Sequence, residues 1–154
     1  MQKVLFVCLG NICRSPAAEG IFTKLINENQ MQDSVSCDSA GTSAYHTGEP
    51  ADARMINHSN RRGYSLTSIS RPFYRETDFE NFDLIVAMDD SNYEDLVRED
   101  EEGLYKDKIV KIVDYCKLHS VPGVPDPYVG GPEGFEYVID ILEDACAELL
   151  KTFK

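Results

Sequence analysis

Two cysteines, an arginine and a serine lie together near the start of the chain, in the segment Cys8 to Ser15 (CLGNICRS). Five residues separate Cys8 from Arg14, a spacing that allows a loop to curl around one small anion. In such a curl Cys8 would lie beneath the anion, and Arg14 would offer two of its oxygens a planar fork of donors. The Ser15 hydroxyl could donate to the sulfur and stabilise its thiolate. These residue types predict attack of a thiolate on a phosphate ester.

A strand and a helix must position this segment. Residues 4–8 (VLFVC) form an apolar, β-prone run that is typical of a strand buried on both faces. From residue 15 onward the apolar residues recur at helical spacing, and Pro16 fits a first helical turn. The loop therefore leads into a helix N-terminus, whose free amides and positive dipole end favour an anion. Gly10 and Asn11 are the residue types that best accept a positive φ in a tight curl.

The rest of the chain alternates strand and helix patterns. We expect strands at residues 35–39, 82–88 and 108–113, helices at 52–62, after 89–91 and at 134–153, and a loop at 120–132. This alternation predicts the α/β class, with a four-stranded parallel sheet and helices on both faces, as a single domain over residues 1–154. Sites in such sheets form beyond the carboxyl ends of the strands, and Cys8 lies at one such end.

The composition limits the functional classes. The formal net charge of −12 argues against nucleic-acid binding, so phosphate chemistry must depend on a locally positive pocket. Five cysteines without metal-binding spacing and three scattered histidines predict neither a disulfide framework nor a metal site, and we expect no cofactor. The first apolar run is too short to span a membrane, and no cleavage site follows it. We therefore expect a cytoplasmic protein that binds no membrane and is a monomer or a weak dimer.

The chain resembles the low-molecular-weight protein tyrosine phosphatases over almost its whole length. Separate motifs in the family's order carry the resemblance, namely VLFVCLGNICRSP at 4–16, DSAGTS at 38–43, FDLIVAMDDSN at 82–92 and PDPY at 125–128. The resemblance implies hydrolysis of tyrosine-phosphorylated proteins or peptides through a phosphocysteine intermediate. It makes Cys8 the nucleophile and Arg14 the phosphate clamp. The remaining phosphate contacts would come from the intervening loop residues Leu9, Gly10, Asn11, Ile12 and Cys13.

The resemblance also assigns a general acid and base. The leaving phenolate must be protonated and a water later activated, and one carboxyl group can do both. Asp126 occupies the family's position for this acid, between Pro125 and Pro127, which stiffen the backbone. Without the resemblance, Asp126 could also be an ordinary turn residue. Asp89 and Asp90 are alternative carboxylates, although capping of the following helix explains them.

Three further roles follow from the resemblance. Ser39 is expected to hydrogen-bond Asn11 and hold its strained conformation. Cys13 is expected to form a reversible disulfide with Cys8 that protects it from overoxidation, although a small buried side chain is the alternative. Some relatives carry a histidine at the position of Ser68, so that contact is absent or replaced here.

Substrate selection should depend on the walls of a slot above Cys8. A nucleophile at the floor of a slot reaches only a phosphate on a long rigid stem, as in phosphotyrosine. Tyr45 and Tyr128 match the family's aromatic wall positions, and Ile12 adds apolar surface. Relatives that act on phosphoarginine carry threonine at the position of Ile12, so isoleucine favours phosphotyrosine.

Other functions remain as alternatives. They are a phosphoarginine phosphatase, a thiol-coupled arsenate reductase of the same fold, a non-hydrolytic phosphocysteine carrier, and a module that binds phosphotyrosine without turnover. The reductase would need further cysteines after the third strand, and residues 88–96 contain none.

Overall fold

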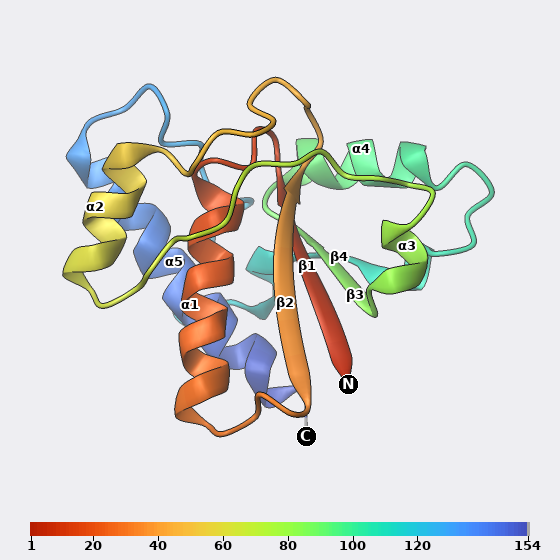
Figure 1. Ribbon diagram of the computed structural model, residues 1–154, viewed down its shortest axis with the longest axis horizontal. Helices are drawn as coiled ribbons and strands as arrows, with labels where there is room; N and C mark the ends of the chain where they lie inside the picture. Colours follow the sequence, from red (N-terminus) through yellow and green to blue (C-terminus); the bar gives the residue numbers. More distant parts are fainter. Residues whose placement is uncertain (154) are drawn as a thin grey trace.

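The computed structural model describes residues 1–153. Its centre is a sheet of four parallel strands in the order β2-β1-β3-β4 (Figure 1). The strands are β1 (Gln2–Cys8), β2 (Val35–Gly41), β3 (Leu84–Ala87) and β4 (Ile109–Lys111). Cys8 ends β1 in register with Gly41, the last residue of β2. The predicted four-stranded parallel sheet is confirmed, and it brings the carboxyl ends of the strands to one edge.

Helices cover both faces of the sheet. On one face lie α1 (Arg14–Glu28), α2 (Ala53–Arg61) and α5 (Pro132–Lys151), and on the other lie α3 (Asp78–Asn81) and α4 (Asp90–Glu99) (Figure 1). Successive side chains of a strand point to opposite faces. Accordingly, β1 contributes Val4 and Phe6 to the first apolar cluster and Leu5 and Val7 to the second.

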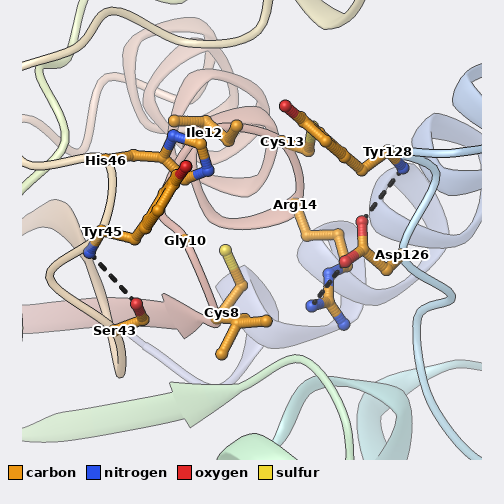
Figure 2. Close-up of a pocket in the computed structure, with 11 residues that line it drawn as sticks. Cys8, Gly10, Ile12, Cys13, Arg14, Ser43, Tyr45, His46, Asp126 and Tyr128 are labelled. Carbon is orange, nitrogen blue, oxygen red and sulfur yellow. Dashed lines mark hydrogen bonds and ion pairs between the residues drawn. The ribbon is translucent and has the colours of Figure 1, made fainter.

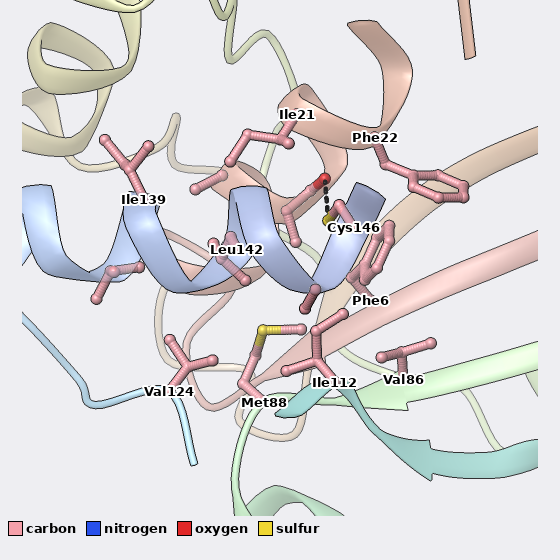
Figure 3. Packing of buried hydrophobic residues seen from close by; sticks show 14 of the residues in the cluster. Phe6, Ile21, Phe22, Val86, Met88, Ile112, Val124, Ile139, Leu142 and Cys146 are labelled. Atoms are coloured by element: carbon pink, nitrogen blue, oxygen red, sulfur yellow. Dashed lines mark hydrogen bonds between the residues drawn. The ribbon is translucent and has the colours of Figure 1, made fainter. Parts of the chain in front are cut away.

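The larger cluster fills the space between the sheet, α1 and α5 (Figure 3). The rings of Phe6 and Phe22 meet edge to face with centroids 5.5 Å apart, and both side chains are fully buried. Burying one such side chain contributes about 1.5–3 kcal/mol. Cys146 of α5 is fully buried against Ala18 of α1. This packing fixes α1 relative to β1, and therefore fixes the loop between them.

Several element boundaries differ from the predictions. The predicted strand at 108–113 ends at Lys111, because Ile112–Tyr115 turns into a 3₁₀ helix that buries Ile112 in the larger cluster. A short apolar run fits a strand and a buried turn equally well, so periodicity could not separate them. The helices Asp78–Asn81 and Lys106–Lys108 were not predicted, since they are too short to show a period. The final helix begins at Pro132, which suits a first turn.

Candidate active site

The segment between β1 and α1 forms a loop whose carbonyl groups are tied to the surrounding protein. Five of its carbonyls accept hydrogen bonds of 2.8–3.2 Å. The donors are Thr42 N to Cys8, Ser43 N to Leu9, Ser70 Oγ to Gly10, Asp52 N to Ile12 and Ala17 N to Cys13. Within residues 1–153, the amides of Leu9, Gly10, Ile12 and Cys13 donate to no acceptor. Free amides at a helix N-terminus form a site that suits an anion.

The sulfur of Cys8 lies at the base of this loop. Cys8 is 2% exposed, and its sulfur accepts a hydrogen bond from Asn11 N at 3.3 Å. Ser15 Oγ lies 3.0 Å from the same sulfur and accepts from Asn11 Nδ2 at 2.8 Å, so its own proton is free to be donated. The alternative acceptor, the Ala40 carbonyl, is 3.4 Å away. Two donors therefore converge on the sulfur, an arrangement that stabilises a thiolate.

The conformation of the loop depends on Asn11. Its φ of 57° lies in the left-handed region, as the sequence predicted. The Asn11 side chain donates to Ser39 Oγ at 3.0 Å and accepts from Arg71 N at 3.0 Å. Both ends of the amide are thus occupied, and the strained residue is held on two sides. The predicted pairing of Asn11 with Ser39 is present in the geometry.

Ser39 connects this arrangement to a half-buried carboxyl group, that of Glu19. Its hydroxyl donates to Glu19 Oε1 at 2.5 Å while accepting from Asn11. Burial raises the pKa of Glu19 above its usual range, and the hydroxyls of Ser39 and Ser68 partly oppose that shift. The Ser68 hydroxyl therefore lies close to Glu19. Nothing in the sequence singles out Glu19, which looks there like an ordinary helical residue.

Gly10 differs from the prediction. It does not adopt a positive φ. A Cβ atom at this position would lie 2.9 Å from Cδ2 of His46, so a larger residue would force the His46 ring to shift. The ring of His46 is thereby brought against the loop.

Arg14 is almost fully buried, and its guanidinium is held by Asp89, which follows β3, and by Val124, in the segment between Tyr115 and α5. Its Nη1 donates to Asp89 Oδ2 at 2.6 Å and to the Val124 carbonyl at 3.1 Å. Asp89 also caps α4 by accepting from Asn92 N at 2.8 Å. The sequence presented Asp89 as a helix cap and as an alternative to Asp126, and the contact with Arg14 was not predicted. Its second role required knowing that β1 and β3 are neighbours in the sheet.

Asp126 lies on the long segment that connects Tyr115 to α5, on the opposite side of the pocket from β1 (Figure 2). Its side chain is 48% exposed, and Oδ2 lies 3.9 Å from Nη2 of Arg14. The other oxygen, Oδ1, accepts a hydrogen bond from Tyr128 N at 3.0 Å. The carboxyl group is therefore accessible to a ligand that enters above Cys8.

These side chains surround one pocket of about 320 Å³ (Figure 2). It is lined by most of the predicted site residues, namely Cys8, Leu9, Gly10, Ile12, Cys13, Arg14, Tyr45, Asp126 and Tyr128. Asn11, Ser15 and Ser39 do not line it and lie buried around the loop. Ser43 and His46 line it without having been predicted.

The walls of the pocket are aromatic. The His46 ring lies 4.8 Å from the Tyr45 ring and 6.1 Å from the Tyr128 ring, measured between centroids. Tyr45 is 83% exposed, so it offers most of its ring to a ligand. Ile12 is almost fully buried and also lines the pocket. No local pattern could have identified His46, which is a lone histidine in a turn-rich stretch.

All five cysteines are free thiols. Cys13 is buried beside the pocket, and burial raises its pKa, with Asp52, Cys8 and Asp126 adding to the shift. Cys13 is therefore protonated at neutral pH. Cys37 and Cys116 are half-buried and pack against the edge of the core.

Residues 1–153 contain neither a membrane-spanning helix nor a cluster of metal-binding side chains. No helix there is both long and apolar enough to cross a membrane. No group of three or more histidine, cysteine, aspartate or glutamate side chains in this range is arranged to hold a metal ion.

Comparison with known proteins identifies the family. Residues 3–154 match the family model described as low molecular weight phosphotyrosine protein phosphatase. A Rattus norvegicus protein of that name is 40% identical, covering 97% of this chain and 94% of the relative. A crystal structure of a protein tyrosine phosphatase from Entamoeba histolytica has a TM-score of 0.94 at 52% identity and covers 99% and 96% of the two chains. A drosophila arginine phosphatase is also similar, with a TM-score of 0.90 at 31% identity over 98% and 97% of the chains. The chain belongs to the low molecular weight phosphotyrosine protein phosphatase family.

Proposed function

We propose that the protein hydrolyses phosphotyrosine in proteins or peptides through a phosphocysteine intermediate. The observation that carries this proposal is the position of the Cys8 sulfur. It lies at the floor of an aromatic-walled pocket, beside a loop with free amides, while Arg14 and Asp126 also line that pocket. Family membership supports the same reaction.

In the first step the Cys8 thiolate forms a bond to phosphorus, and the bond from phosphorus to the tyrosine oxygen breaks. The departing oxygen takes the bonding electron pair and a proton from Asp126, which acts as general acid. Arg14 and the free amides of the loop stabilise the charge on the equatorial phosphoryl oxygens. The products are tyrosine, phosphocysteine and the Asp126 carboxylate.

In the second step Asp126 acts as a general base. It takes a proton from a water molecule while the water oxygen bonds to phosphorus. The bond between sulfur and phosphorus breaks, and its electron pair returns to Cys8 as a thiolate. Ser15 and Asn11 donate to that sulfur, so they stabilise it as a leaving group. Inorganic phosphate is released and the enzyme returns to its starting state.

The walls of the pocket support selectivity for an aromatic phosphate. Tyr45 and Tyr128 can pack against a phenyl ring, and Ile12 presents an apolar surface to it. A drosophila arginine phosphatase has a similar structure, so phosphoarginine is the competing substrate. Isoleucine at position 12 favours the flat, apolar stem of phosphotyrosine over a guanidinium, which seeks hydrogen-bond acceptors.

The proposal includes a redox role for Cys13. A peroxide would oxidise the Cys8 thiolate to a sulfenic acid, and the Cys13 sulfur would then attack it, forming a disulfide and releasing water. Because burial keeps Cys13 protonated, we expect this second step to be slow at neutral pH.

The proposal is tested by comparing hydrolysis of peptides that carry phosphotyrosine, phosphoserine or phosphoarginine. The wild type should act on phosphotyrosine, with turnover reduced on the order of 10⁴-fold or more in Cys8→Ser. Asp126→Ala should lower turnover roughly 10²–10⁴-fold. No turnover by the reduced wild type would contradict the proposal and favour a carrier or a binding module. Preference for phosphoarginine would refute the substrate class alone.

A further inference from the structure

Arg54, in the first turn of α2, contacts Tyr128 of the pocket wall without being part of the pocket lining itself. Its Nη2 donates to the Tyr128 carbonyl at 2.7 Å. Its guanidinium carbon lies 5.4 Å from the centre of the Tyr128 ring and 4.8 Å from that of Phe135. One cation therefore holds the backbone and the ring of Tyr128 and also contacts α5.

The guanidinium of Arg54 is itself held in place by Asp52. Its Nε and Nη2 donate to the two carboxylate oxygens of Asp52 at 3.1 and 3.0 Å. The backbone amide of Asp52 donates to the Ile12 carbonyl at 2.8 Å, in the loop that carries Cys8. Arg54 and Asp52 therefore connect the nucleophile loop to the segment that carries Asp126.

The segment around Asp126 has few other attachments. Residues 125–130 form two internal hydrogen bonds, from Tyr128 N to Asp126 and from Gly130 N to Pro127. Within residues 1–153, the hydrogen bond from Arg54 is the only one that residues 125–130 form with the rest of the protein. The contact between Asp126 and Arg14 is longer, at 3.9 Å.

We infer that Arg54 is a positioning residue for the proposed general acid. Arg54 fixes the carbonyl and ring of Tyr128, and the amide of Tyr128 donates to Asp126 Oδ1. The orientation of the Asp126 carboxyl group toward the leaving oxygen thus depends on Arg54. The inference rests on the proposed function, in which Asp126 delivers the proton.

A planar guanidinium is needed for this arrangement. It bridges a carboxylate in bidentate fashion, donates to a carbonyl and stacks on aromatic rings at the same time. The ammonium group of a lysine is a single point charge and cannot make all of these contacts in one geometry. Arg54→Lys should therefore behave more like Arg54→Gln than like the wild type.

The leaving group of the substrate separates this role from a structural one. Phenyl phosphate releases a basic phenolate that needs the proton, whereas 4-nitrophenyl phosphate releases a far less basic one that depends on the proton much less. Loss of Arg54 should lower kcat/KM for phenyl phosphate about tenfold, a part of the roughly 10²–10⁴-fold that a general acid contributes. For 4-nitrophenyl phosphate kcat/KM should change less than about threefold.

The experiment measures kcat/KM on both substrates for wild type, Arg54→Gln, Asp126→Ala and the double variant. If Arg54 acts through Asp126, then Arg54→Gln should have almost no further effect in the Asp126→Ala background. Arg61→Gln is the matched control, because Arg61 is exposed on the same helix and its loss changes the charge equally. It should leave both substrates unchanged.

Equal losses on both substrates that persist in the Asp126→Ala background would overturn the inference, since Arg54 would then act on the substrate directly. An Asp126→Ala variant as fast as wild type on phenyl phosphate would refute the proposed acid and the inference with it. Should Arg54→Gln fail to fold, Asp52→Asn provides the second variant, because it releases one side of the guanidinium. Asp52→Asn should show a weaker form of the same leaving-group dependence. A variant without this dependence would also count against the inference.

Discussion

The two loops that meet at the pocket are held in opposite ways. The loop from Cys8 to Arg14 has its carbonyls tied outward, and Ile12, Cys13 and Arg14 are each no more than 7% exposed. The segment around Asp126 is fixed from outside mainly by Arg54, and its Tyr128 and Val129 are 44% and 93% exposed.

This difference matches the chemistry proposed for each loop. Donors that stabilise transition-state charge are effective only if they need no rearrangement during the reaction, so the nucleophile loop must be held rigidly. The acid segment delivers one proton and must leave room for a protein substrate and then for water. Few attachments suffice for it, provided that they define the direction of the carboxyl group.

Two glycines give the sharpest test of this comparison. A Cβ at Gly41 would lie 2.7 Å from the Leu9 carbonyl oxygen and 3.2 Å from Cβ of Asn11, so Gly41→Ala must displace the nucleophile loop. We expect a loss of about 1–3 kcal/mol in stability. The displacement should also lower kcat/KM on the order of 10²-fold, measured with an aryl phosphate.

Gly130→Ala is the matched change in the acid segment. The nearest atom to a Cβ there is the Pro127 carbonyl oxygen at 3.7 Å, an ordinary contact. Activity should stay within about twofold of wild type and the melting temperature should not fall. A large loss of activity in Gly130→Ala would show that the acid segment is as tightly constrained as the nucleophile loop.

Asp144 tests where the acid segment is anchored. This buried carboxylate of α5 accepts from the amides of Lys117, Leu118 and His119, each at 2.9 Å, just before the segment reaches Asp126. Burial alone would raise the pKa of Asp144, but these hydrogen bonds and one from the His119 ring lower it to about 2. A depressed pKa means that the stabilisation is present above about pH 4 and is lost as the pH falls toward 2.

Asp144→Asn should therefore cost on the order of 2 kcal/mol at neutral pH and less at about pH 2, measured by denaturant unfolding. Activity should change less than about twofold, because Arg54 fixes the segment nearer to Asp126. Asp140→Asn is the control on the same helix. Its side chain is 48% exposed, so its loss should cost less than about 1 kcal/mol. A large loss of activity in Asp144→Asn would place the functional anchor here instead.

Asp89 tests the attachment of Arg14. Asp89→Ala removes both the cap of α4 and a partner of the buried guanidinium. We expect about 1 kcal/mol of lost stability from the cap and about a tenfold lower kcat/KM from the loosened arginine. Asn at this position retains an acceptor, so Asp89→Asn should recover most of the stability.

Asp90→Ala is the neighbouring control for Asp89. Its carboxylate is 62% exposed and pairs with Lys111 on the surface, so activity should stay within about twofold of wild type. Equal effects of Asp89→Ala and Asp90→Ala would mean that capping, and not the orientation of Arg14, explains the result.

A site residue could be predicted from the sequence only where the residues that define its role lie close to it in the chain. Cys8, Arg14 and the strand-to-helix context lie within one short segment, and Asp126 lies in a motif, so the sequence identified them. The second role of Asp89 and the role of Arg54 depend on partners 75 and 74 residues away. Each looks ordinary in its own segment, as a helix cap and an exposed helical arginine. Such roles arise only from the order of strands and the packing of α2 beside α5.

The smallest expected effect concerns Glu19, beneath the nucleophile loop. Burial raises the pKa of this carboxyl, so the folded protein retains its proton to a higher pH than the unfolded chain does. Stability should therefore fall as the pH rises from the usual glutamate range to the raised pKa of Glu19, and stay constant above it. Glu19→Gln, which keeps an acceptor for Ser39, should remove this part of the pH dependence, measured by thermal melting between about pH 4 and 8. An unchanged slope in the variant would mean that Glu19 is already ionised at acidic pH. The nucleophile loop would then rest on a buried charge, and Ser39→Ala should cost more activity than a neutral partner would imply.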